Sequence, residues 1–430
     1  MKAWKPVVLA AACALLAACG PPQVDSSAPA ADERTGTLRV WLFDEADRNP
    51  KQATVDDAVR EFEATHQGVE VDVQYISVDT RSQRFTGAFN DPASAPDVAE
   101  YGNSDLASYV AAGGFADLGQ DLASWPEAAD LSPSVLETAT IDGKVYGVPW
   151  YTGIRALYYR TDVFAELGLQ PPRSTAELID TAARIRTARP DLYGISVGGK
   201  YHYAMMPFLW TAGGELARQE GGGWKSTVDS PQAQKGIADY ASLISPGICP
   251  PEQCADMTGT QSVQTFASGK AAMTIGGDFN RSAVDDPGAA AAGKYSVVPL
   301  PGAAPGSIAP AFAGGNLLGV LKSSQRATLA KEFVHLLAGK QYQRRMFDAM
   351  GNLPTFTDVQ QQIAAEEPAI KPFVDSLRAG TRFVPASPAW AEIDAQGVLP
   401  TMVQQIVTGT PVAEATRAAA DKMNTTFEGR

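Results

Sequence analysis

Aromatic residues stand where strands are predicted to end and helices to begin, beside Gly, Pro or polar residues rather than inside apolar runs. Ring faces can stack on the apolar C–H faces of sugars, while nearby Asp, Asn, Glu and Arg side chains match the hydroxyl groups. In open parallel sheets, ligands bind beyond the carboxyl ends of the strands, where such residues fall. Core packing explains any single ring equally well, so only the whole set of rings indicates a sugar-binding site. The set is Trp41, Tyr101, Trp150, Tyr151, Trp210, Phe279 and Trp390.

Common catalytic motifs are missing from the sequence. It has no Gly-x-x-x-x-Gly-Lys-Ser/Thr, no His-Glu-x-x-His and no Gly-x-Ser-x-Gly. The acidic run at 44–49 resembles a calcium loop but lacks its turn glycine and closing Glu. A secreted glycoside hydrolase or lyase stays open as an alternative, because a carboxylate pair such as Glu45 with Glu100 leaves no signature in sequence. We expect a binding protein rather than an enzyme, with no cofactor and no metal.

Residues 1–18 have the layout of an export signal. Two lysines precede an apolar run, which is too short to be a permanent membrane span. The following Leu-Ala-Ala-Cys resembles a bacterial lipobox, in which Cys19 is lipidated and becomes the new N-terminus. An ordinary signal peptide with a chance cysteine is the alternative. Residues 19–36 contain almost nothing to bury and are predicted to form a flexible tether.

The charge of the chain limits its partners. The whole chain carries a formal net charge of −13, and removing the two lysines of the signal leaves −13 − 2 = −15. Such an acidic body argues against nucleic acid as a partner and against electrostatic attachment to anionic lipid. Membrane attachment is therefore expected to come from the lipid on Cys19.

Two cysteines remain after Cys13 leaves with the signal and Cys19 takes the lipid. They are Cys249 and Cys254, and in an exported protein a lone close pair most simply forms a disulfide. A zinc site would need further ligands, and the three histidines lie far apart in sequence. We therefore predict a disulfide.

Hydrophobic periodicity predicts an α/β protein. Residues 38–43 and 69–75 alternate between apolar and other side chains as strands do, and residues 54–65 place apolar side chains on one helical face. This βαβ unit indicates a parallel sheet. Further strands alternate with helices, and from residue 324 the chain is predicted to be almost wholly helical. Later strands are predicted at 96–101, 194–197, 271–275, 295–300 and 316–321, and helices at 203–213, 231–243 and 260–268, besides one opened by a capping box at Ser174.

The segment 143–164 has the clearest pattern in the chain. It runs from a turn through a Pro-aromatic corner into a strand, and then into a short helix at 162–167 that Thr161 is expected to cap. This layout suits a crossing between two lobes, with Gly153 supplying backbone freedom. We expect Trp150, Tyr151 and Arg155 to face the cleft at this hinge.

Several segments, in this order, resemble the extracellular solute-binding proteins of carbohydrate ABC importers, the maltose-type family. Each is loose alone, and together they are specific to the family but not to a sugar. Besides the lipobox, the segments are Pro96–Val98 through Gly113–Leu118 (GGFADL), Gly143–Pro149 (GKVYGVP), Leu157–Phe164 (LYYRTDVF), Phe266–Asp278 (FASGKAAMTIGGD), Gly314–Asn316 (GGN) and Gly351–Thr355 (GNLPT).

The resemblance implies a two-lobed, periplasmic-binding-protein-like (type II) α/β fold with hinge crossings and a helical C-terminal region. We expect residues 37–153 and 313–355 to form the N-terminal lobe, and residues 154–312 and 356–430 to form the C-terminal lobe. The two forms of such a protein, open and closed, would differ by a hinge rotation that the ligand favours.

The resemblance also implies positions for the ligand site. Arg155 falls where the family often has an acidic residue, which leaves the sugar preference open. An arginine at this position also supports anion binding as an alternative. Glu45 is predicted from its place at the end of the first strand alone. The positions matching family contacts are Tyr101 with Asn103 beside it, Tyr203 or Trp210, Asp278 with Phe279, Asn316 and Trp390.

We therefore expect a monomeric, lipid-anchored receptor on the extracytoplasmic face of the cell membrane. It would hold an oligosaccharide or sugar derivative and deliver it to ABC permease subunits. A binder of another solute, such as a polyamine, peptide or anion, is the second alternative, and would keep the fold without the aromatic platforms.

Overall fold

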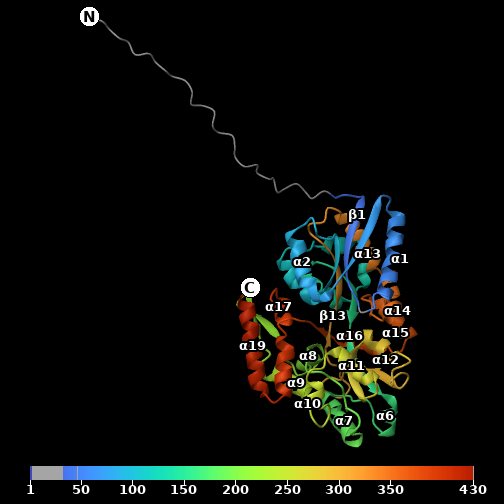
Figure 1. Cartoon of the computed structure of the whole chain (residues 1–430), viewed down its shortest axis with the longest axis vertical. Coiled ribbons are helices and arrows are strands. Elements are labelled where there is room, and N and C mark those ends of the chain that lie inside the picture. Colours follow the sequence, from blue (N-terminus) through green and yellow to red (C-terminus); the bar gives the residue numbers. More distant parts are fainter. Residues whose placement is uncertain (2–31, 46, 430) are drawn as a thin grey trace.

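The computed structural model describes Met1, residues 32–45 and residues 47–429 (Figure 1). The predicted signal and lipidated Cys19 lie outside these residues, as does most of the tether. In Figure 1 the described chain has an upper part and a lower part. The upper part contains β1 (Gly36–Phe43), α1 (Asn49–Thr65), α2 (Arg81–Asn90) and α13 (Ala327–Leu337), and the lower part contains α6 (Thr161–Glu166), α7 (Thr175–Ala188) and α9 (Pro231–Ser242). Each part is built around its own sheet.

The upper sheet has five strands in the order β2-β1-β3-β13-β6. Strand β1 pairs in parallel with both β2 and β3, while β13 is antiparallel to β3 and to β6. The predicted βαβ unit is confirmed. The strands are β1 (Gly36–Phe43), β2 (Val69–Ile76), β3 (Val98–Gly102), β6 (Val148–Gly153) and β13 (Gly314–Val320).

Alternation along β1 explains how this sheet is covered on both faces. Leu38, Val40 and Leu42 are fully buried on the face that α1 and α13 cover, and α1 begins at Asn49 rather than at 54 because Pro50 suits its first turn. Trp41 points to the other face and packs edge-on against Phe85 of α2. The helices of this part are α1 (Asn49–Thr65), α2 (Arg81–Asn90), α3 (Leu106–Ala111), α4 (Gly119–Ser124), α5 (Pro133–Glu137), α13 (Ala327–Leu337) and α14 (Lys340–Met350), with hairpin β4 (Thr140–Ile141) and β5 (Lys144–Val145).

The lower sheet has three antiparallel strands in the order β10-β7-β11. The strand predicted at 194–197 does not form; Tyr193 and Ser196 make only isolated bridges to Ala271 and Thr274. Gly194 lies so close to α7 that a Cβ there would meet the Ala182 carbonyl at 1.9 Å, and its N–H bonds to the Ile248 carbonyl instead of to β10, so the ladder beside β10 is interrupted. The strands are β7 (Arg155–Arg160), β10 (Met273–Gly277) and β11 (Tyr295–Val298).

Helices surround the lower sheet, and the C-terminal region is helical as predicted. Helix α6 starts at Thr161 itself, whose hydroxyl caps nothing, so the predicted N-cap is wrong by one residue. Cys249 and Cys254 form the predicted disulfide. The helices are α6 (Thr161–Glu166), α7 (Thr175–Ala188), α8 (His202–Thr211), α9 (Pro231–Ser242), α10 (Pro251–Cys254), α11 (Gly259–Ala267), α12 (Arg281–Asp285), α15 (Thr357–Glu366), α16 (Lys371–Ala379), α17 (Trp390–Ala395), α18 (Val398–Val407) and α19 (Val412–Glu428), and the short strands are β8 (Ala217–Glu220), β9 (Gly223–Ser226), β12 (Ala311–Phe312) and β14 (Thr381–Arg382).

The chain passes between the two sheets at three places. It leaves β6 at Gly153 and enters β7 at Arg155, and it returns through Ala313 from β12 to β13. The third passage follows α14, which packs on α1, and leads to α16, which packs on β7; Leu353 there bridges to Thr152. Within the described residues, no helix is both long enough and apolar enough to cross a membrane.

Candidate functional site

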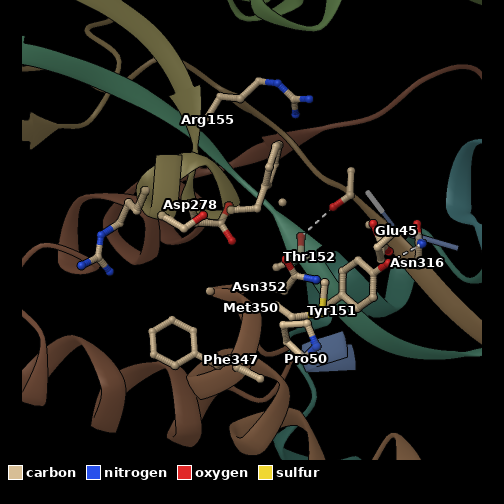
Figure 2. A pocket seen from close by; sticks show the side chains of 18 of the residues that line it. Glu45, Pro50, Tyr151, Thr152, Arg155, Asp278, Asn316, Phe347, Met350 and Asn352 are labelled. Carbon is tan, nitrogen blue, oxygen red and sulfur yellow. Dashed lines mark hydrogen bonds between the residues drawn. The ribbon is translucent and has the colours of Figure 1, made fainter. Parts of the chain in front are cut away.

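A cavity of about 890 Å³ lies where the three passages meet, and both sheets line it (Figure 2). Several of its polar side chains follow the carboxyl ends of strands, as expected for sites in open sheets, whereas Arg155 begins β7 and Asn316 lies near the start of β13. The predicted ligand residues that line it are Glu45, Asn103, Tyr151, Arg155, Tyr203, Asp278, Phe279 and Asn316.

Four other predicted residues do not reach the cavity and belong to the core. Tyr101 is fully buried, stacks on Phe115 and donates its hydroxyl hydrogen to the Tyr146 carbonyl at 2.9 Å. Trp150 points to the opposite side of β6 from Tyr151, because neighbouring side chains on a strand alternate. Trp210 and Trp390, 5% and 1% exposed, pack in the core of the lower part. For these four rings, packing is the role that the structure shows.

A buried ion pair supports the wall formed by Glu45, Tyr151 and Asn316. The Glu100 carboxylate accepts from Lys51 Nζ at 2.9 Å and from the Phe43 main-chain N–H at 2.7 Å through Oε2. Its Oε1 accepts from the Tyr151 hydroxyl at 2.7 Å and from Asn316 Nδ2 at 2.6 Å. Lys51 also donates to Glu45 Oε1 at 3.0 Å. Figure 2 shows Glu45, Tyr151 and Asn316 together at one side of the cavity.

The sequence pointed to Glu100 only as a possible partner of Glu45 in glycoside cleavage. The structure does not support that use, because Glu100 is fully buried and four donors already occupy its carboxylate. Lys51 stands between the two acids and bonds to both. A general acid or nucleophile must reach the glycosidic bond, and Glu100 cannot.

Arg155 projects from β7 into the cavity among aromatic rings. Its guanidinium carbon lies 5.3 to 5.9 Å from the ring centres of Tyr201, Tyr203, Phe279 and Phe312. Its Nε donates to the Tyr201 hydroxyl at 3.1 Å. Among the described residues no carboxylate lies within ion-pair distance of it, so Arg155 lines the cavity without an acidic partner. Tyr201 and Phe312 could not be identified from the sequence, because only the fold brings them to Arg155.

Phe279 is the aromatic ring best placed to meet a ligand. It is 39% exposed, one of few large apolar side chains exposed in the described part of the chain. The ring lies over Gly277, where a Cβ would come within 2.3 Å of it, and beside Gly153. These glycines therefore leave room for an open ring face at the cavity.

Asp278 joins the lower sheet to two of the passages. Its Oδ1 accepts from the Ile154 main-chain N–H at 2.7 Å, and its Oδ2 accepts from that of Leu353 at 2.9 Å. The side chain is fully buried, and this burial raises its pKa to about 7 despite both bonds. Asp278 therefore joins two of the passages by hydrogen bonds and is not an exposed group for a ligand.

Tyr203 lies at the edge of the cavity in a polar cluster. Its ring stacks on Phe312 and its hydroxyl donates to Asp394 Oδ2 at 3.4 Å. Asp394 belongs to α17, which packs against α3 and the turn Asn103–Asp105. Helix α17 therefore lies beside the cavity, and its first residue, Trp390, is buried in the core of the lower part.

Helix α14, the third passage and α12 supply wall residues that could not be assigned from the sequence. Phe347, Met350 and Asn352 line the cavity, with Arg281, which pairs with Glu367 at 3.1 Å. The segment Gly351–Thr355 was a family signal in the sequence, but nothing local showed that it borders the site. Among the described residues, no group of three or more His, Cys, Asp or Glu side chains is arranged to hold a metal ion.

Comparisons with known proteins agree with this architecture. A family described as bacterial extracellular solute-binding protein matches residues 46–344. The diacetylchitobiose binding protein DasA of Streptomyces coelicolor is 27% identical over 417 residues, 95% of this chain and 94% of that protein. The sugar-binding protein MalE from Xanthomonas citri matches with a TM-score of 0.80 and 25% identity over 92% of this chain and 98% of that chain. A Thermotoga lettingae solute-binding protein bound with α-D-tagatose matches with a TM-score of 0.76 and 25% identity, over 91% and 100% of the two chains.

Proposed function

The chain belongs to the bacterial extracellular solute-binding protein family, and we propose that it is the lipid-anchored, sugar-binding component of an ABC importer. The family consists of binding proteins of transporters, not of enzymes, and the type II periplasmic-binding-protein fold is that of the structural neighbours. The ligand in this proposal is an oligosaccharide or a sugar derivative.

The observation that carries the proposal is the composition of the cavity wall. An exposed ring, Phe279, lies at the same cavity as hydrogen-bonding groups from both sheets, among them Glu45, Asn316 and Arg155. A sugar has the same mixture, with apolar C–H faces for a ring and hydroxyl groups for carboxylates and amides. The relatives add support, since DasA is named for diacetylchitobiose and the Thermotoga lettingae protein holds α-D-tagatose.

Capture would occur by closure of two lobes about the three passages. We assign residues 37–153 and 313–355 to one lobe and residues 154–312 and 356–430 to the other. The changes of sheet at Gly153, Ala313 and Gly351–Phe356 support this division. A ligand that touches both lobes favours the closed form, which a monomer would then present to the permease subunits.

Titration calorimetry of the chain from residue 20, which lacks the predicted signal and Cys19, tests the proposal. The panel is maltose, trehalose, N-acetylglucosamine, diacetylchitobiose and a galactooligosaccharide, with spermidine, a tripeptide and phosphate as non-sugar solutes. We expect heat of binding with at least one saccharide and none with the other solutes. Binding of a non-sugar solute with no saccharide would overturn the proposal.

Arg155 favours a second candidate, an anionic solute. Its guanidinium faces the cavity without a carboxylate within 4 Å among the described residues, and arginine matches carboxylate and phosphate groups in geometry. The phosphate member of the panel, together with glucuronic acid, distinguishes this candidate. Binding of both anions without neutral sugars would favour it.

A further inference from the structure

The side chains of the wall formed by Glu45, Tyr151 and Asn316 have no hydrogen-bond donor left for a ligand. Lys51 carries three hydrogens and makes three bonds, to Phe43 O, Glu45 Oε1 and Glu100 Oε2. All three lie within the protein, and the lysine side chain is only 1% exposed. The only cation behind this wall therefore cannot donate into the cavity from its position, within the part of the chain that is described.

The polar side-chain hydrogens of Tyr151 and Asn316 are likewise already used in hydrogen bonds within the protein. The Tyr151 hydroxyl has one hydrogen and donates it to Glu100 Oε1. Asn316 Nδ2 donates to Glu100 Oε1 and to the Tyr151 oxygen, each at 2.6 Å. The opposite orientation of the amide would place its oxygen against a carboxylate oxygen at that distance, so the nitrogen must face Glu100.

We propose that Glu100 is a positioning residue that makes this wall an acceptor-only surface, so that the ligand must donate hydrogen bonds there. The groups left for the ligand are the Asn316 Oδ1 atom, the Glu45 carboxylate and the Tyr151 oxygen. The ligand chemistry is a hydrogen-bond donor, either a sugar hydroxyl or the ammonium group of an amino sugar. The inference rests on the proposed function for the identity of the ligand, but not for the orientation of the wall.

Burial keeps the side chains of this wall in their acceptor-only arrangement. Glu100 is fully buried, and its two carboxylate oxygens accept from four donors, one of which is the Lys51 ammonium group. Burial, followed by the charges of Glu100 and Glu45, keeps the pKa of Tyr151 well above its ordinary value, so the phenol retains the hydrogen that it donates. Residues outside this wall, such as Arg155 and Ser104, can still donate from other sides of the cavity.

The variant Glu100→Gln tests the proposal, since it exchanges one acceptor atom for a donor with little change in shape. The amide oxygen can still accept from Lys51 Nζ and from the Phe43 main-chain N–H, and the amide nitrogen then faces Asn316. Asn316 must rotate to accept from it and release its own N–H groups to the cavity. Lys51 retains Glu45 as its acidic partner, so the variant is expected to fold.

Ligand selectivity is the first measurement. The probes are maltose and diacetylchitobiose, each compared with analogues in which one hydroxyl is replaced by fluorine, which cannot donate. For one hydroxyl position the wild type should bind the fluorinated analogue about tenfold more weakly, as expected for one lost bond to a charged or buried acceptor. Glu100→Gln should abolish or reverse that ratio, and glucosamine in place of glucose distinguishes an ammonium donor from a hydroxyl. An unchanged ratio in the variant would overturn the proposal while leaving sugar binding intact.

Hydrogen exchange of the Asn316 side-chain amide is the second measurement and needs no ligand. In the ¹⁵N-labelled wild type these hydrogens should exchange slowly with solvent, and in Glu100→Gln they should exchange rapidly. The matched control is Glu61→Gln, a glutamate that accepts a Tyr342 hydroxyl at 2.8 Å away from the cavity. Rapid exchange in the wild type would overturn the proposal even if no saccharide bound, whereas absent saccharide binding with slow exchange would count against the proposed function alone.

Discussion

Lys51 and Glu100 form an ion pair with 2.9 Å between Nζ and Oε2, and their side chains are 1% and 0% exposed. Breaking a buried pair on one side costs more than the pair contributes, because the remaining charge stays buried without its partner. This pair lies directly beneath the polar wall of the cavity, so it links the stability of the upper part to the geometry of the site.

The variant Lys51→Met should lower the free energy of unfolding by about 3–5 kcal/mol, because Glu100 would remain buried without its counterion. Urea denaturation followed by circular dichroism measures this change. The control is Lys371→Met, which removes an exposed i,i+4 partner of Asp375 and should cost less than about 1 kcal/mol. An equal loss in the free energy of unfolding for the two variants would show that burial of the pair does not raise the cost of removing its lysine.

Phe279→Ala should weaken saccharide binding by on the order of 1 kcal/mol or more, because the open ring face would no longer stack on the sugar. Thermal stability should change little, since the ring is 39% exposed. Calorimetry with the saccharide that binds in the panel gives the affinity. Val78→Ala is a suitable control, as Val78 is equally exposed but does not line the cavity.

Trp390→Ala should act on stability, although sequence resemblance placed this residue at the ligand. Removing a buried tryptophan leaves a large cavity in the core and typically costs about 3–5 kcal/mol. Differential scanning calorimetry measures the loss, and Trp390→Phe should recover part of it. A variant with wild-type stability but without saccharide affinity would return Trp390 to the binding site.

The buried Asp278 carboxyl makes stability depend on pH in a defined direction. Its pKa is about 7 in the folded protein and about 4 in the unfolded chain, so the folded state holds an extra proton between these values. The stabilisation linked to this proton is complete below about pH 4 and is lost as the pH rises through about 7.

Asp278→Asn removes that titration. Wild type should therefore be more stable relative to the variant at pH 5 than at pH 8, as measured by urea denaturation at both values. Asp285→Asn, which makes the same acid-to-amide change at a side chain with 47% exposure on α12, is the matched control. A difference between wild type and Asp278→Asn that is independent of pH would refute the assignment.

Cys19→Ala tests the proposed anchor. The variant should move from the membrane fraction to the soluble extracytoplasmic fraction, because the acidic body offers no electrostatic attachment to anionic lipid. Immunoblotting of the two fractions decides it, with Cys249→Ala as the control, since Cys249 lies in the disulfide. Continued tethering of Cys19→Ala would count against the lipobox.

The sequence by itself determined many of the elements and the class of fold. Alternation in residues 38–43, the helical face of the following segment and the close pair Cys249 and Cys254 are local patterns, and all appear in the structure. Local patterns predict secondary structure because the side chains of neighbouring residues are placed by the backbone geometry of one strand or one helix. The resemblance of scattered segments identified the family for the same reason, since each segment is short and continuous.

Only the tertiary structure decided which side chains share the cavity. Glu100 and Asn316 are 216 positions apart and meet because β3 and β13 pair, while Trp150 and Tyr151 are adjacent but take opposite faces of β6. Whether a ring is core or site depends on what the rest of the chain packs against it, which is why Phe279 is exposed and Trp390 is buried. Burial also made Lys51 and Glu100 a pair, since the network of donors and acceptors around them exists only once distant strands have come together.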